Sequence, residues 1–240
     1  LDTLYTVEPV QDGERSFVIR RVGDVQLLSL AYHVPSAQHE DFPAIQMLNT
    51  VLADTPTGRL HKALVEKKLA ASVSGYAGQF HDPGLSMFFV TLGRSDAIEP
   101  ARDAMLKNVE ALASEPITAG ELERARSKYF KQFDLNLAAT ESAAIGLTST
   151  IALGDWRLLF YDRDRVKKLA VADVQRVADK YFKPSNRTLG QFIPTEKPDR
   201  AEIPAVPNVA ELLKDYKGGE AVAQGENFEP SPANIEARTK

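Results

Sequence analysis

The sequence contains no cysteine among its 240 residues. Without cysteine the chain can form no disulfide, hold no zinc through thiolates and use no thiol as a nucleophile. The absence is compatible with a cytosol and with a periplasm alike, so it assigns no compartment.

An excess of basic charge and long apolar runs are also missing. The 29 basic and 33 acidic residues give a formal net charge of −4, which provides no positive field to neutralise phosphates. No run approaches the roughly 18 apolar residues of a membrane-spanning helix. The sequence therefore predicts no nucleic acid and no membrane as a partner. The first ten residues lack the regions of a signal peptide, and there is no initiator methionine, as expected of an excised fragment.

Histidine is scarce, and its spacing does not form a metal motif. The four candidates are His33, His39, His61 and His81. A helical zinc site needs two histidines on one face, as in H-x-x-E-H, whereas His39-Glu40 is followed by Asp-Phe-Pro. The sequence therefore predicts no metal ligand and no cofactor-binding residue in this chain.

Other catalytic motifs are absent as well. No serine stands in G-x-S-x-G, and no G-x-x-x-x-G-K-[ST] loop is present to bind phosphate. The carboxylate pairs Asp162/Asp164 and Glu121/Glu123 lie among arginines and lysines, which is typical of charged helix faces. The residues alone predict a scaffold without catalytic groups.

The residues that are present alternate between strand and helix patterns. Strands are predicted over 17–21 and 25–34, as an antiparallel pair, and over 69–80, 85–92 and 187–193. Helices are predicted from 41, through 60–64, over 98–109, from 118, over 141–153 and over 171–182. Ser95 is predicted to cap the helix over 98–109, and Thr118 with Glu121 forms a capping box. Strands in groups separated by runs of helices indicate an α+β fold, a sheet with helices packed on one face.

The composition changes near the end of the last predicted strand. Residues 1–195 are predicted to form one α+β domain. Residues 196–240 are rich in Pro, Gly and Glu and poor in large apolar side chains, which is typical of a linker. A short helix is predicted within it over 208–216.

Four blocks, in this order, resemble the second domain of insulinase/pitrilysin-type zinc peptidases, which include the mitochondrial processing peptidases. The blocks are VQLLSLAYHVPSAQHEDFPAIQMLNTVLAD, GRLHKALVEKKLAASVSG, PITAGELERARSKY and VADVQRVADKYFKPSNRTLGQFIP. The resemblance covers roughly residues 15 to 195. It implies an α/β sandwich domain with an antiparallel or mixed sheet, one of a pair that closes around an unfolded peptide.

In that family only one domain carries zinc on an H-x-x-E-H helix. The other half usually contributes an Arg and a Tyr from a segment of the form L-R-E-x-x-G-L-A-Y, which suit a developing negative charge. Matching Leu64 and Glu66 to this segment, with one residue missing near its Gly, places Val65 at the Arg position and Ala71 at the Tyr position. Neither side chain donates a hydrogen bond. The resemblance thus implies that both auxiliary positions are lost, and that this chain alone has no peptidase activity.

The resemblance implies a catalytically inactive domain of a zinc metalloendopeptidase. Its expected partners are a zinc-bearing domain of the same protein, encoded upstream, and an unfolded peptide held in a chamber or along an edge of the sheet. The segment PSPANIEARTK resembles the link between the two domain pairs of long members. Long bacterial members are commonly exported, so the resemblance alone favours a periplasmic location. The alternative is a non-peptidase assembly subunit of the same fold, like the core proteins of respiratory complexes.

Overall fold

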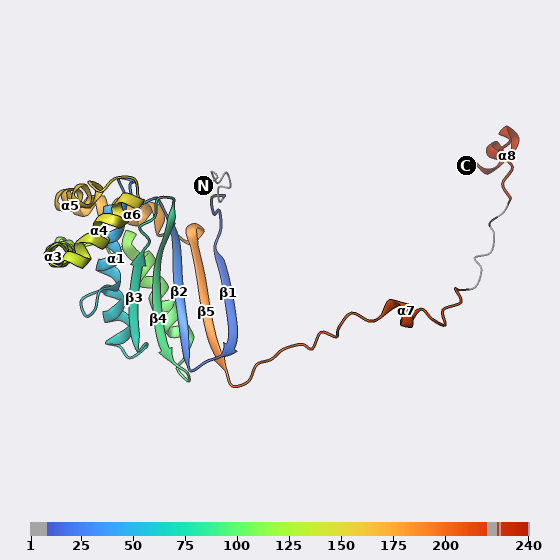
Figure 1. The fold of residues 1–240 in the computed structure, drawn as a ribbon, viewed down its shortest axis with the longest axis horizontal. Helices are drawn as coiled ribbons and strands as arrows, with labels where there is room; N and C mark the ends of the chain where they lie inside the picture. The colour runs from blue at the N-terminus through green and yellow to red at the C-terminus, as the bar shows by residue number, and fades with distance from the viewer. Residues whose placement is uncertain (1–8, 220–224, 226, 240) are drawn as a thin grey trace. The chain divides into compact units, whose positions relative to one another are not determined.

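A computed structural model describes residues 9–219, 225 and 227–239. Its contacts divide the chain into two units, Leu1–Asp199 and Arg200–Lys240. The first unit contains the sheet and most of the helices (Figure 1).

Five strands form one mixed sheet in the order β1-β5-β2-β4-β3. The strands are β1 (Arg15–Val22), β2 (Val25–Val34), β3 (Ser72–Ala77), β4 (Gly84–Gly93) and β5 (Arg187–Thr195). β1 and β5 are parallel, and every other pair is antiparallel. The helices gather on one side of the sheet (Figure 1). The predicted α+β class, a mixed sheet with helices on one face, is confirmed.

The predicted antiparallel pair of 17–21 with 25–34 is wrong, because β5 lies between β1 and β2. The turn between the two strands suggested a hairpin, but local turn chemistry carries no information about a strand that arrives from the far end of the domain. Gly190 of β5 makes the insertion possible. A Cβ there would lie 2.5 Å from the Ser29 Oγ and 2.6 Å from the Phe17 ring.

The helices follow the predicted pattern with one addition. They are α1 (Phe42–Ala53), the π-helix η1 (His61–Val65), α2 (Ile98–Glu110), the 3₁₀ turn η2 (Ala111–Ala113), α3 (Ala119–Ala138), α4 (Thr140–Ala152), α5 (Leu158–Lys168), α6 (Val171–Tyr181) and the 3₁₀ turn η3 (Pro184–Asn186). The sequence does not predict α5, because charged residues interrupt the helical spacing of its apolar residues. The Thr118–Glu121 capping box is confirmed. Ser95 does not cap α2, whose N-cap is Ala97.

The core lies between the sheet and the helices. Alternate residues of β2, including Leu28, Leu30 and Tyr32, are fully buried, as are Leu48 and Leu52 of α1. Burying a leucine or isoleucine side chain stabilises the fold by about 1.5–3 kcal/mol. α1 contacts β3, β4, α3, α5 and α6, so it is the central helix of the domain.

The other face of the sheet is apolar and open. Strand alternation sends Phe17, Ile19, Leu27 and Phe89 to this face, where each is between 38% and 48% exposed. We call these four residues the open-face cluster. They come from three of the five strands, β1, β2 and β4, and the partly buried Phe192 of β5 pairs between Ile19 and Leu27.

The second unit contains two short helices, α7 (Val209–Leu212) and α8 (Pro232–Arg238). Each is capped at its start, by the Asn208 side chain bonding to the Ala210 amide and by the Ser231 side chain bonding to the Asn234 amide. The Arg238 guanidinium lies 5.5 Å from the centre of the Phe228 ring. Within the described residues of both units, no helix has the length and apolarity to cross a bilayer.

Candidate functional site

A groove runs beside β3, the last strand of the sheet, whose outer edge no other described strand pairs with. Its main part has a volume of about 440 Å³ and is lined by β3, α1 and α3. A second part of about 300 Å³ continues along β3. The two parts share Gln46, Asn49, Thr50 and Gly75. The groove therefore follows an unpaired strand edge.

Gly75 allows β3 to lie directly against α1. A Cβ at this position would come 2.5 Å from the Ala53 Cβ and 2.6 Å from the Asn49 Oδ1. Asn49 is itself fixed, because its Nδ2 donates to the Ser86 Oγ at 3.1 Å and both side chains are buried. The floor of the groove is thus a close contact between helix and strand.

α1 presents three polar side chains to the groove in an otherwise apolar helix. Gln46, Asn49 and Thr50 stand at positions i, i+3 and i+4. This is the spacing with which an H-x-x-E-H helix presents its two histidines and its glutamate. Two carboxamides and a hydroxyl do not supply the imidazole and carboxylate ligands of a zinc site. Because Asn49 is buried and bonded to Ser86, Gln46 and Thr50 are the side chains that can bond a polar ligand.

These three residues were missed by the sequence analysis. The available signal was three polar residues at helical spacing within FPAIQMLNTVLA, where the surrounding pattern predicts burial. That signal identifies a face of the helix. Only the position of β3 makes the face part of a groove.

α3 forms the opposite wall with Lys128, Tyr129 and Gln132. The Lys128 ammonium is ion-paired with the Asp54 carboxylate, which also accepts a hydrogen bond of 2.8 Å from the Thr57 hydroxyl. Burial, with the nearby Asp162 charge, raises the pKa of Tyr129 to about 12, so its phenol stays protonated at neutral pH. The wall provides a cation and neutral polar groups.

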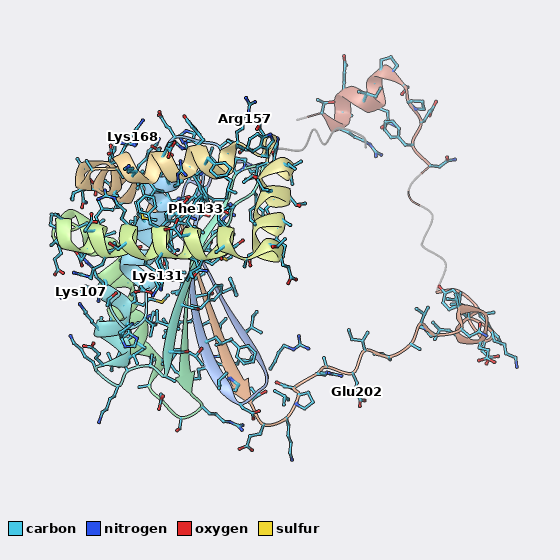
Figure 2. All side chains as sticks on the ribbon, turned by 60° about the vertical axis from the view of Figure 1, so that its left-hand side comes forward. Lys107, Lys131, Phe133, Arg157, Lys168 and Glu202 are labelled. Atoms are coloured by element: carbon cyan, nitrogen blue, oxygen red, sulfur yellow. The ribbon has the colours of Figure 1, made fainter. Side chains whose placement is uncertain are left out.

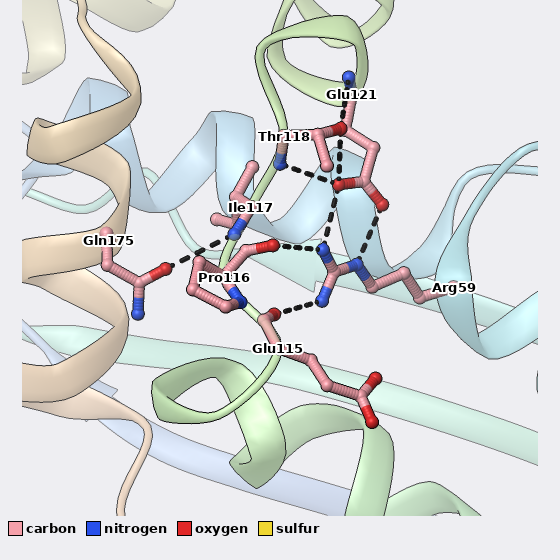
Figure 3. Close-up of polar contacts among 7 residues, drawn as sticks. All are labelled: Arg59, Glu115, Pro116, Ile117, Thr118, Glu121 and Gln175. Carbon is pink, nitrogen blue, oxygen red and sulfur yellow. Dashed lines mark hydrogen bonds and ion pairs between the residues drawn. The ribbon is translucent and has the colours of Figure 1, made fainter.

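Arg59 precedes η1 and has a structural role (Figure 3). Its guanidinium donates to both carboxylate oxygens of Glu121, at 2.7 and 2.8 Å, and to the carbonyls of Glu115 and Pro116, at 2.7 and 2.8 Å. The side chain therefore ties the start of η1 to the start of α3. Because these hydrogen bonds are made within the domain, the guanidinium has few N–H donors left for a ligand.

Val65 and Ala71, the two positions matched to the family's Arg and Tyr, lie on either side of a tight turn. Val65 is the last residue of η1 and packs partly buried against the core. Ala71 is exposed just before β3, and its amide donates to the Thr91 carbonyl at 2.8 Å. Between them, Lys68 has a φ of 58°, the left-handed conformation that favours glycine.

The four histidines are not brought together. His33 lies in β2 and His61 begins η1. The His39 Nδ1 accepts a hydrogen bond of 3.0 Å from the Asp41 amide, and the His81 Nδ1 lies 3.1 Å from an Asp82 carboxylate oxygen in a turn. Across the described part of the chain, no three His, Asp or Glu side chains are grouped to hold a metal ion.

Comparison with known proteins shows what this fold and sequence are similar to. The family model described as the Peptidase M16 inactive domain matches residues 2–129. A curated relative, zinc protease PqqE of Helicobacter pylori, is 27% identical over 190 residues, which are 78% of this chain and 43% of that protein. The chain thus spans less than half of the length of this relative.

Two solved structures agree with the family match. The inactive peptidase domain of a provisionally named zinc protease from Bordetella parapertussis is 42% identical, with a TM-score of 0.69 over 75% of this chain and 98% of that one. A protease from Helicobacter pylori is 26% identical, with a TM-score of 0.76 over 80% of this chain and 47% of that one. The chain therefore belongs to the family of peptidase M16 inactive domains.

Proposed function

We propose that the chain is the catalytically silent domain of a zinc metalloendopeptidase, that it docks on a zinc-bearing domain, and that it helps to enclose an extended peptide. The family membership and the zinc-protease relatives support the first part. Zinc would be held by the upstream domain, since the groove of this chain offers amides and hydroxyls where a zinc helix has histidines and glutamate.

In this proposal residues 1–195 are the peptidase-like domain and residues 196–240 are a linker with a short helix inside 208–216. The division of contacts near Asp199 and Arg200 supports the boundary. The linker would connect this domain to the rest of the protein. Proteolysis that cuts first within 196–240 and leaves a stable core is the expected result.

The open-face cluster is the surface that we assign to the zinc-bearing domain. An exposed apolar patch that spans several strands usually marks a contact with another protein surface. The helices already cover the opposite face of the sheet, so a docked domain would complete a second layer. Burial of Phe17 and Phe89 would supply much of the binding energy.

The unpaired edge of β3 beside the groove is the observation that carries peptide binding. An extended peptide can add to such an edge through main-chain hydrogen bonds, while every second side chain enters the adjoining groove. β3 has the sequence SVSGYA, which carries no charge that would keep a further strand away.

The other free edge, β1, is less suited to this role. It carries Arg15, Arg20 and Arg21 and is exposed along its whole length. Charged side chains on an edge strand oppose the addition of another strand. The groove of about 440 Å³ is lined by residues of β3 and by none of β1.

N-methylated peptides test this edge directly. An added strand points every second amide at β3. Of two peptides methylated on opposite sets of alternate nitrogens, the one whose methyl groups face β3 should not bind, and the other should bind normally. Binding is read by anisotropy of a labelled unfolded peptide and by amide chemical shifts. Shifts at Gly75 and Ala77 are expected, with none at Val18 and Arg20 of β1. Equal loss of binding by the two methylated peptides, or chemical-shift changes on β1, would contradict the proposal.

Val65 and Ala71 provide a second test. Substituting Val65→Arg and Ala71→Tyr together should create no peptidase activity in this chain alone, because no zinc-bound water is present to attack a peptide bond. The assay is cleavage of a quenched fluorescent peptide with zinc added. Chelator-sensitive cleavage by the double variant would show that the assignment of these positions is wrong.

One observation distinguishes an active zinc protease from the alternative, an assembly subunit without peptidase activity. The residues encoded immediately upstream should contain H-x-x-E-H if the chain belongs to an active zinc protease. An upstream domain of the same fold that lacks this motif would favour the assembly subunit.

A further inference from the structure

Three cations lie along one face of α3, and one of them lines the groove. Arg124, Lys128 and Lys131 are spaced at i, i+4 and i+7, so they share one face of the helix. Lys128 lines the main groove, and Arg124 lines an adjoining cavity that also includes Thr50 and Asp54. Lys131 projects from the next turn of α3 (Figure 2). We call these three residues the α3 cation row.

In the ion pair of Lys128 with Asp54, the cation is the more exposed partner. The Lys128 side chain is 60% exposed and the Asp54 side chain only 13% exposed. Burial opposes ionisation of Asp54, but Lys128 and Thr57 hold the pKa of its carboxyl below the ordinary value. An approaching ligand therefore meets an ammonium group with unused N–H donors, behind which the carboxylate is already satisfied.

The acidic residues of the first turns of α3 do not cancel this charge at the groove. Glu121 is ion-paired with Arg59 and Glu123 with Arg126. The remaining polar side chains of the wall are neutral, with Gln46 on α1 and Gln132 on α3. The main groove thus holds one cation and one carboxylate, of which the cation is the more exposed, beside the carboxamides of Gln46 and Gln132.

We infer that the groove selects extended peptides with an aspartate or glutamate at the position whose side chain points toward α1 and α3. This inference rests on the proposed binding along β3. The ligand carboxylate accepts a hydrogen bond from the Lys128 ammonium, and the carboxamides of Gln46 and Gln132 line the same groove. A lysine or arginine at that position meets the α3 cation row and is repelled.

Matched peptides test the inference. Two labelled unfolded peptides differ only in having Glu or Gln at every second position. We expect the Glu peptide to bind about three- to tenfold more tightly at low salt, as for a partly exposed ion pair, and the difference to shrink as salt is added. Lys128→Gln should remove the difference and leave the affinity of the Gln peptide unchanged.

Two further variants control for charge and fold. Lys128→Arg keeps the cation and should keep the preference for Glu, while unchanged binding of the Gln peptide by Lys128→Gln shows that the latter variant is folded. Lys107→Gln removes an exposed lysine from α2, outside the groove, and should change nothing (Figure 2). A preference for Glu that survives Lys128→Gln would overturn the role of Lys128.

The outcomes separate this inference from the proposed function. Binding of both peptides with equal affinity by the unchanged protein would overturn acidic selectivity while peptide binding stands. Binding of neither peptide would overturn the proposed function itself. Tighter binding of a Lys peptide than of the Glu peptide would show that Asp54, and not Lys128, faces the ligand.

Discussion

Asp41, just before α1, is a fully buried carboxylate with several partners. It is ion-paired with Arg176 at 2.6 Å and with Lys180 at 2.9 Å, and the Tyr181 hydroxyl donates to it at 2.7 Å. All three partners lie on α6. Burial alone would raise the pKa of Asp41, but these partners hold it well below the ordinary value of 3.8. The residue therefore fastens the central helix to α6.

Asp41→Asn should lower the free energy of unfolding at neutral pH by about 1–3 kcal/mol, because charge-assisted bonds are lost inside the fold. Since the folded pKa lies below the unfolded one, this stabilisation is complete above pH 4 or so and disappears as the pH falls through the folded pKa. Urea unfolding across this range is the measurement. Arg176→Gln, at a half-exposed position, should cost less. A difference between Asp41→Asn and the unchanged protein that stays constant with pH would contradict this account.

Lys68 adopts a left-handed conformation in which a Cβ is unfavourable. Lys68→Gly should raise the free energy of unfolding by about 0.5–1 kcal/mol, because glycine adopts this φ without strain. Lys67→Gly is the matched control at the preceding residue and should be neutral or destabilising. Thermal unfolding of the two variants decides between them, and equal effects would show that the backbone at residue 68 is not strained.

At the scale of elements, Arg59 and Glu121 join the start of η1 to the start of α3. The Arg59 guanidinium holds the pKa of Glu121 at about 2, against an ordinary value of 4.5, although burial opposes this. A carboxyl with a depressed pKa contributes stability that is complete above pH 4.5 and is lost as the pH falls toward 2. The contact thus makes the junction of the two elements sensitive to acid.

Glu121→Gln should therefore be destabilising by about 1–3 kcal/mol at pH 7, and the difference should close between pH 4.5 and pH 2. Denaturant unfolding as a function of pH measures it. Glu123→Gln, whose side chain is 63% exposed, is the control and should change stability little at any pH. A similar pH dependence in both variants would place the effect on α3 as a whole.

Much of each element could be predicted from local sequence. The capping box at Thr118 fixes where α3 begins, and the apolar run over 85–92 gives β4 and its pairing with β3. The position of β5 could not be predicted, because parallel pairing of β1 with β5 depends on residues at the two ends of the domain. α5 was missed because its short apolar spacing is interrupted by charges.

Less of the candidate site could be predicted. The family resemblance identifies Val65 and Ala71, which lie at a turn before β3. The groove depends on Gly75 approaching Asn49 and on Lys128 arriving from a helix far along the chain. No spacing in one segment encodes such a meeting of three elements. The residue types of the groove, amides and one lysine, also match no catalytic motif.

At the scale of the whole molecule, the domain has one covered and one open face. The helices bury the inner residues of β2 and β4, while the open-face cluster remains exposed. Burying Phe17, Ile19, Leu27 and Phe89 against a second domain would remove apolar area from water and stabilise both domains. The groove beside β3 would remain accessible in this arrangement, because it lies between the strand edge and the helices.

Ile19→Lys on the open face tests this arrangement. Ile19 is 43% exposed, so the change should alter the stability of the isolated chain by no more than about 1 kcal/mol. A charge within a docked apolar surface should weaken binding to the zinc-bearing domain about tenfold or more. Sedimentation of the mixed domains measures the affinity. Ile145→Lys replaces the same residue type on α4, where it is 60% exposed, and should leave binding unchanged. Equal weakening by both variants would show that the effect is not specific to the open face and would contradict this arrangement.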